Sequence, residues 1–204
     1  MARIVNPTPG DPFGEGHLCD YLRESIWLNT NSGIHYLLPK PYEYADFEIL
    51  SLDPAKLVPL AKYVLRGNLA ILESLEKELL PEGFDIFNLR GMVQIDENNL
   101  ICPPIIEVWH QDPHKYDGRK VIVDGLHRCY IAHKRGIAIT CVLISGKISS
   151  DLPVLPLTWN DVLEQDSVPK DKRNYHPGIP PPWKPHEVYR QTFPGSTGPR
   201  MPKI

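Results

Sequence analysis

The stretch 120–144 constrains the fold more than any other part of this 204-residue chain. Its first four residues, Lys-Val-Ile-Val, favour a strand, and an Asp-Gly turn follows at 124–125. A segment of helical composition then runs to Arg135, Gly136 stands where a helix would end, and 138–144 is again apolar. Strand, glycine turn, helix, glycine stop and strand in this order predict a βαβ unit within an α/β or α+β domain with a mixed sheet.

The other predicted elements are short and are separated by turn residues. A strand is expected at 47–52, ended by Asp53 and Pro54. A helix is expected to begin at an Asn68 cap, because leucines recur at helical spacing at 69, 72, 75 and 79. Further helices are predicted at 17–28 and 56–65, and further strands at 92–95 and 105–109.

The chain divides into three parts by composition. Residues 41–150 hold most of the predicted elements and are interpreted as the folded domain, with an N-terminal extension at 1–40 and a C-terminal extension at 151–204. Eleven of the 22 prolines lie in 151–204. Aromatic residues also recur there, which favours a proline-rich wrap against the body over a free tail. They are Trp159, Tyr175, Trp183, Tyr189 and Phe193.

Composition argues against several classes of protein. The chain has no run of eighteen apolar residues, so no transmembrane helix and no membrane partner are expected. Its first residues lack an apolar signal region, and its four widely spaced cysteines form no CxxC pair, which favours reduced thiols and a cytoplasmic location. The net charge of −3 argues against nucleic acid as a partner, and a homodimer is left open.

Charge is distributed unevenly along the chain. Residues 101–150 carry seven Lys/Arg and four Asp/Glu, a net of +3, whereas residues 41–100 carry a net of −6. A local positive field would favour an anionic ligand near 101–150. A solvated basic surface without a ligand is the alternative interpretation.

The turn at 124–128 has the residue types of a phosphate site. A helix start leaves backbone N–H groups unpaired, and Gly125 would let a ligand approach the backbone closely. Two cationic side chains in the first helical turn, His127 and Arg128, are unfavourable unless an anion binds. Asp124 could hold Mg²⁺ or accept a proton. Alternatively, Asp124 merely caps the helix, His127 packs in the core and Arg128 lies on the surface.

The residues from Lys120 to Gly136, with the strand that follows to Ile144, resemble the signature of the ParB/sulfiredoxin-like superfamily. The upstream segment 102–109, Cys-Pro-Pro-Ile-Ile-Glu-Val-Trp, is similar to the Pro-Ile-x-Val strand of that superfamily. The resemblance covers roughly residues 45–146 and is most specific over 101–144. It implies that the G-x-x-R turn cradles nucleotide phosphates, with the binding residues Gly125, Leu126, His127 and Arg128.

The branches of this superfamily differ in chemistry. Leu126 stands where sulfiredoxins carry their catalytic cysteine, which argues against sulfinic acid reduction, and Cys129 is interpreted as a packed thiol. The proline-rich chain after Ile144 does not suit the helix-turn-helix domain that follows the motif in ParB partition proteins. The motif resembles most nearly the Asp-Gly-x-His/Thr-Arg of the free-serine kinases, matched here by Asp124, Gly125, His127 and Arg128.

That resemblance implies a kinase that transfers a phosphoryl group from ATP or ADP, with Mg²⁺, to the hydroxyl of a small metabolite such as an amino acid. Asp124 would act as base or metal contact. The free-serine kinases also use a Glu after their first strand, which this sequence does not match, so Asp53 and Glu48 are the candidates for a second catalytic carboxylate.

Two other functions stay open. One is a non-catalytic nucleotide-binding or protein-interaction module, favoured by the missing Glu and the aromatic tail; the other is a ParB-like DNA-binding or nuclease protein. His110, Asp112 and His114 would suit a metal, although such polar loops are usually solvated. Glu107 is expected on the sheet surface, with a place at the edge of the site as the alternative.

Overall fold

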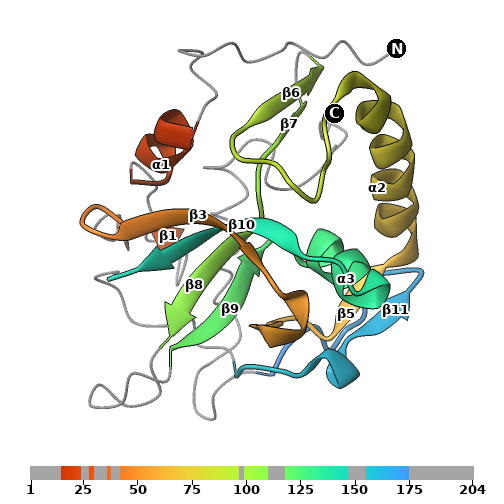
Figure 1. Ribbon diagram of the computed structural model, residues 1–204. Coiled ribbons are helices and arrows are strands. Elements are labelled where there is room, and N and C mark those ends of the chain that lie inside the picture. The colour runs from red at the N-terminus through yellow and green to blue at the C-terminus, as the bar shows by residue number, and fades with distance from the viewer. Residues whose placement is uncertain are drawn as a thin grey trace.

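The computed structural model describes residues 15–23, 28–29, 36–37, 42–96, 99–109, 118–146 and 155–174. A five-stranded sheet forms the centre of the described part, and three α-helices accompany it (Figure 1). The strands lie in the order β3 (Asp46–Leu52), β10 (Ile139–Ser145), β8 (Ile105–Trp109), β9 (Arg119–Asp124) and β4 (Leu57–Val58). The pairs β3–β10 and β8–β9 are antiparallel, whereas β10–β8 and β9–β4 are parallel, so the predicted mixed α+β sheet is confirmed.

The sheet is buried on both faces, because successive side chains along its strands point to opposite sides. Ile105 packs in a cluster with Leu18 and Leu22 of α1 (Glu15–Arg23). The next residue, Ile106, packs in a second cluster with residues of α2 (Arg66–Leu79) and α3 (Leu126–Arg135). Figure 1 shows α1 apart from the α2–α3 pair.

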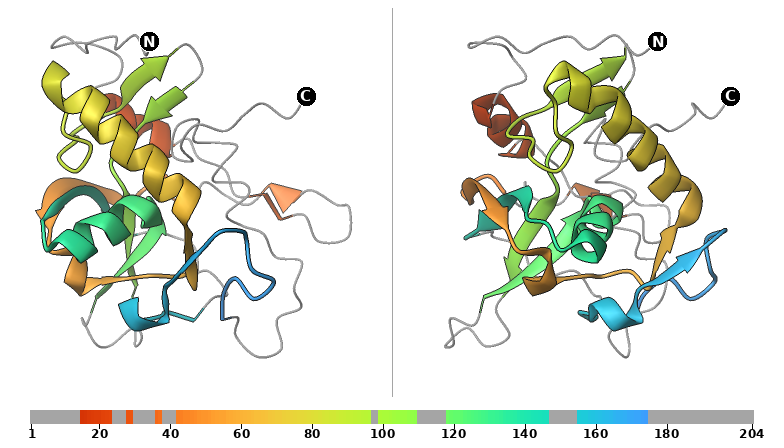
Figure 2. Two further views of the ribbon diagram at one scale, coloured as in Figure 1. Left: turned by 90° about the vertical axis from the view of Figure 1, so that its right-hand side faces the viewer. Right: turned by 45° about the vertical axis from the view of Figure 1, so that its right-hand side comes forward.

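Three two-stranded sheets and three 3₁₀ turns complete the described part. The sheets are β1 (Leu28–Asn29) with β2 (Tyr36–Leu37), β6 (Val93–Asp96) with β7 (Asn99–Ile101), and β5 (Tyr63–Leu65) with β11 (Leu163–Gln165). The turns are η2 (Pro54–Lys56), η3 (Leu80–Glu82) and η4 (Trp159–Asp161). Figure 2 shows β5 leading into α2 beside β11.

Several predicted elements are found close to where the residue pattern placed them. The strands predicted at 47–52, 92–95, 105–109, 120–123 and 138–144 correspond to β3, β6, β8, β9 and β10. Helix α3 begins after Gly125 and ends at Gly136, both with positive φ, as the glycine signals predicted. Helix α2 buries Leu75 and Leu79, and Leu69 and Leu72 pack against the same cluster.

Three predictions about elements were wrong. The residues predicted as a helix at 56–65 instead form the end of η2, β4 and β5, because Leu57 and Val58 pair with β9 and Pro59 cannot donate within a helix. Helix α2 starts at Arg66 rather than behind an Asn68 cap, and α1 ends at Arg23 rather than near residue 28.

The predicted βαβ unit is also wrong in its geometry. Strands β9 and β10 flank α3 in sequence, but β8 lies between them in the sheet. Because β8 runs antiparallel to β9 and parallel to β10, the two strands that flank α3 run in opposite directions. The unit is therefore strand, helix and strand without the parallel crossover of a βαβ motif.

Residues 155–174 lie against the body of the domain. Leu157 donates its backbone N–H to Pro59 O, and Leu163 donates to Lys62 O. The indole Nε1 of Trp159 donates to Pro54 O at 2.8 Å, and its ring stacks on His133 with centroids 4.6 Å apart. For residues 155–174, these contacts agree with the prediction that the C-terminal extension packs against the domain.

Some predictions fall outside the described residues. They are the loop with His110, Asp112 and His114, considered for a metal, and the tail aromatics Tyr175, Trp183, Tyr189 and Phe193. Within the described residues, no helix is long and apolar enough to cross a membrane. The same residues contain no group of three or more His, Cys, Asp or Glu placed to hold a metal ion.

Candidate functional site

The candidate site is the turn between β9 and α3. Asp124 is the last residue of β9 and lies opposite Ile105, the first residue of β8. Gly125 follows with φ 84° and ψ 18°, and its carbonyl accepts the backbone N–H of Cys129 as the first bond of α3. No side chain caps this helix start within the described residues. The first N–H groups of α3 therefore point out of the helix beside Asp124.

The role of Gly125 differs from the prediction. A Cβ built on Gly125 would lie 2.7 Å from Cβ and 2.9 Å from Cα of Pro104. The space freed by the missing side chain is thus filled by the segment before β8 rather than being open to a ligand. Together with the left-handed backbone, this close approach explains why glycine stands at this position.

Arg128 is the third residue of α3, and only 4% of its surface is exposed. Its Nη2 donates a hydrogen bond to Cys102 O. Its Nη1 is buried and has no hydrogen-bond partner among the described residues. Buried polar atoms in native proteins are nearly always hydrogen-bonded, so this guanidinium nitrogen lacks the acceptor that such a group ordinarily has.

His127 is joined to the start of α2 rather than standing as a free cation. The backbone N–H of Leu65 donates to His127 Nε2 at 2.9 Å, and Asn68 Nδ2 lies 3.5 Å from the same nitrogen. A backbone N–H can only donate, so Nε2 carries no proton and the ring is neutral in this arrangement. Of the two side chains expected to be unfavourable cations in the first turn of α3, only Arg128 therefore carries a positive charge.

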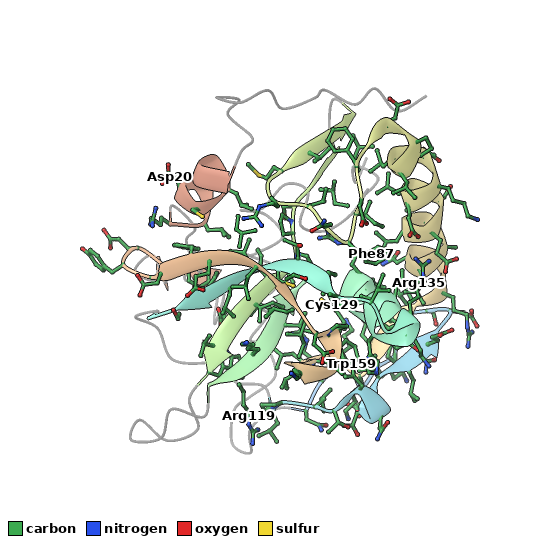
Figure 3. All side chains as sticks on the ribbon, viewed as in Figure 1. Asp20, Phe87, Arg119, Cys129, Arg135 and Trp159 are labelled. Carbon is green, nitrogen blue, oxygen red and sulfur yellow. The ribbon has the colours of Figure 1, made fainter. Side chains whose placement is uncertain are left out.

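Asp124 and Arg128 flank a group of buried thiols. Burial raises the pKa of Cys102 to about 12, with Arg128 lowering it and Asp124 raising it by smaller amounts. Burial also raises the pKa of Cys129 well above its ordinary value, helped by a hydrogen bond with Cys141. Figure 3 shows Cys129 on the inner side of α3 and Arg135 at the other end of that helix. The interpretation of Cys129 as a packed thiol is consistent with this burial.

The structure does not bring Glu48 to the turn. Glu48 belongs to β3, which is separated from β9 by β10 and β8. Glu48 is in register with Ile122 of β9, so three strand spacings of about 4.8 Å place it more than about 14 Å from Asp124. Asp53 caps η2, where its carboxylate accepts the N–H of Ala55 at 3.0 Å. Of the two carboxylates on the sheet, Asp124 therefore lies at the turn and Glu48 does not.

Glu107 was expected on the sheet surface and is instead completely buried. Tyr42 Oη donates to its Oε1 at 2.5 Å, and Trp109 Nε1 donates to its Oε2 at 2.6 Å. The signal for this burial was in the sequence: side chains two apart on a strand share a face, so Glu107 shares the α1 side with Ile105 and Trp109. A carboxylate there needs donors, which the neighbouring aromatic side chains supply.

Sequence reasoning also missed the first turn of α2 as a neighbour of the site. Leu65 was predicted in a helix at 56–65 and Asn68 as the cap of the next helix, and the structure places both beside His127. The two helix starts therefore meet at this ring. No pattern within either segment could have revealed this, because it depends on how β5 is placed relative to α3.

The fold is an α+β domain with a mixed sheet, in which a glycine turn leads from β9 into helix α3. A comparison with protein-family models matches residues 26–163 to the ParB CE domain. This range covers more than half of the chain, so the protein belongs to the ParB CE domain family. No curated protein and no solved structure was found to match the chain.

Proposed function

We propose that this protein binds the phosphate groups of a nucleotide at the turn formed by Asp124, Gly125, Leu126, His127 and Arg128. The single observation that carries the proposal is Arg128 Nη1, a buried guanidinium donor without a hydrogen-bond partner in the described part of the chain. It stands in the first turn of a ten-residue helix, where the helix dipole also favours an anion. A phosphate oxygen would satisfy both features.

Mg²⁺ suits the same place. A single carboxylate together with phosphate oxygens is a common way for a protein to hold Mg²⁺, and Asp124 supplies that carboxylate. A bound Mg²⁺ would neutralise charge on the phosphates. Asp124 is the described residue that would contact it.

Phosphoryl transfer to a small hydroxylated metabolite is the reaction that we propose for this site. The γ-phosphoryl group of ATP would pass to the acceptor oxygen, ADP would leave, and the hydroxyl proton would go to Asp124. Such transfer depends mostly on positioning and on charge stabilisation, which Arg128 and the amides of α3 can supply. Because Glu48 lies three strands from Asp124, we assign Asp124 as the proton acceptor.

The binding test uses two arginines on the same helix. Arg128→Gln removes the buried guanidinium, whereas Arg135→Gln removes an exposed one that pairs with Glu76 at the far end of α3. Calorimetry with Mg²⁺ and ATP, ADP or CTP is expected to show binding to the wild type and to Arg135→Gln. Binding to Arg128→Gln should be weaker by about tenfold or more.

Arg128 is buried, so its loss can also affect folding. Circular dichroism and a thermal melt of each variant show whether it is folded, and Arg128→Lys supplies a second variant that keeps the charge but loses the Nη1 donor geometry. Absence of binding to the folded wild type, or equal binding to folded Arg128→Lys and wild type, would refute the proposal.

Turnover distinguishes a kinase from a non-catalytic binding module. Wild type and Asp124→Asn are incubated with Mg²⁺, ATP and a panel of hydroxylated amino acids, and ADP formation is measured. A kinase requires acceptor-dependent ADP formation that Asp124→Asn lowers by at least a hundredfold. Binding without any turnover would favour the non-catalytic module.

A further inference from the structure

The C-terminal strand β11 contacts the start of α2 through one arginine. Arg66 Nη1 lies 2.8 Å from Asp166 Oδ2, and Arg66 Nε lies 3.6 Å from Glu164 Oε2. Arg66 Nη2 also donates to the carbonyl oxygen of Glu164 at 3.3 Å. The acidic groups of one segment thus surround a cation from another, 98 residues earlier in the chain.

Arg66 directly follows the residue whose backbone contacts His127. It is the first residue of α2, and the residue before it, Leu65, donates to His127 Nε2. Strand β5 ends at Leu65 and pairs with β11, where Leu65 lies opposite Gln165. Leu65 of β5 therefore connects β11 with the turn at 124–128, because it pairs with β11 and also contacts His127.

A cation in the first turn of a helix is unfavourable for the helix dipole unless an anion accompanies it. Glu164 and Asp166 supply that anion in the described structure. A polyphosphate bound at the adjacent turn would supply more negative charge to the same guanidinium, and arginine binds phosphate oxygens readily.

We propose that β11 is a built-in competitor for the phosphate site, in which Asp166 and Glu164 occupy Arg66 until a nucleotide polyphosphate draws it away. This inference rests on the proposed function, because it names how nucleotide binding at the same turn is regulated. The C-terminal segment then tunes affinity through charge: the more firmly β11 holds Arg66, the weaker the binding of nucleotide.

The exposure of this ion pair makes the exchange feasible. The side chain of Arg66 is 52% exposed and that of Asp166 is 82% exposed. Exposed ion pairs contribute little to stability and are screened by salt, so they can exchange partners at small cost.

Tyr130 Oη donates to Glu164 Oε1 at 3.0 Å, so Glu164 also has a structural contact with α3. Asp166 is therefore the cleaner position for a test.

The test measures ATP affinity by calorimetry at low, constant ionic strength. Asp166→Asn is expected to bind ATP about 1.5- to fivefold more tightly than the wild type, which is the range of an exposed ion pair. Arg66→Gln should bind more weakly, and adding Asp166→Asn to Arg66→Gln should change nothing further, because the competition needs both partners.

Asp20→Asn is the matched control. It removes the same charge from an exposed Asp–Arg pair, Asp20 with Arg23 at 3.0 Å on α1, on the other side of the sheet. If Asp20→Asn and Asp166→Asn raise the affinity for ATP equally, the inference is overturned, because the increase would then be a general effect of the lost negative charge. An ATP affinity of Asp166→Asn equal to that of the wild type would also overturn the inference.

Failure of the two proposals can be told apart. If the wild type binds none of the nucleotides, the proposed function fails and this inference fails with it. If the wild type binds ATP and Arg128→Gln does not, while Asp166→Asn binds as the wild type does, only the competition by β11 is refuted.

Discussion

Gly125 is restricted by two independent features, its left-handed backbone and its contact with Pro104. Gly125→Ala would strain the backbone and force a Cβ against Pro104 at 2.7 Å. We expect this substitution to lower the free energy of unfolding by about 2–4 kcal/mol, measured by denaturant titration.

Gly67 supplies the matched control for that substitution. It lies in the first turn of α2, and a Cβ there would have no neighbour within 4 Å. Gly67→Ala is expected to leave stability unchanged or raise it by up to about 1 kcal/mol. Similar losses of stability in both variants would show that the Pro104 contact does not restrict Gly125.

The buried thiols give a prediction about pH. Because the pKa of Cys102 is raised to about 12 in the folded protein, Cys102 contributes stability that is complete below the ordinary thiol pKa. That contribution is lost as the pH rises from the ordinary value towards 12.

At pH 8, iodoacetamide followed by mass spectrometry should find Cys19 alkylated before Cys102 and Cys129. Fast alkylation of Cys129 in the folded protein would contradict its assignment as a packed thiol.

At the scale of single residues, sequence reasoning located the turn but not what each residue does there. The pattern Asp-Gly-x-His-Arg placed the candidate site at 124–128 without knowledge of the fold. It could not show that Pro104 fills the space beside Gly125, or that Leu65 fixes the protonation of His127. Both facts depend on segments far away in sequence.

At the scale of elements, local patterns succeeded where one element carries its own signal. Helix α3 lies between two glycines and α2 has a leucine face, so both were predicted. The strands β4 and β5 have two and three residues, and their conformation is set by pairing with β9 and β11. Such short strands have no periodicity of their own, which is why 56–65 was mistaken for a helix.

Trp159 connects the C-terminal segment to two other elements. Its indole N–H donates to Pro54 O of η2, and its ring stacks on His133 of α3. Trp159→Phe, which keeps a ring but loses the hydrogen bond, should lower the free energy of unfolding by about 1 kcal/mol. Trp159→Ala should lower it by about 2–4 kcal/mol, because the stacking surface is lost as well.

Leu163→Ala is the control for Trp159, since Leu163 lies on β11 in the same segment but is 58% exposed. Its loss should cost less than about 0.5 kcal/mol in chemical denaturation. If Trp159→Ala costs no more than Leu163→Ala, the segment 155–174 does not stabilise the domain through Trp159.

At the scale of the whole molecule, the sheet topology decides which residues can act together. The pattern predicted a mixed α+β domain, and this is what the strands form. It did not predict that β8 and β10 separate β3 from β9, since strand order is set by long-range pairing and not by local sequence. For that reason Glu48 and Asp53 were grouped with Asp124, although the sheet holds Glu48 well away from it.

The proposal of a small anionic ligand is consistent with the charge distribution. The overall charge is −3, and Arg66 and Arg135 are both paired with carboxylates of the same chain. Arg128 differs because it is buried and because its Nη1 has no hydrogen-bond partner among the described residues. A single buried donor at a helix start suits a phosphate group, whereas binding to DNA requires many exposed cations.

The most direct test of the central claim is a crystal structure of the protein soaked with Mg²⁺ and ATP. The claim predicts phosphate density within hydrogen-bond distance of Arg128 Nη1 and of the first amides of α3. Density for the nucleotide at another place, or an Arg128 Nη1 already bonded to a protein group in the nucleotide-free crystal, would contradict it.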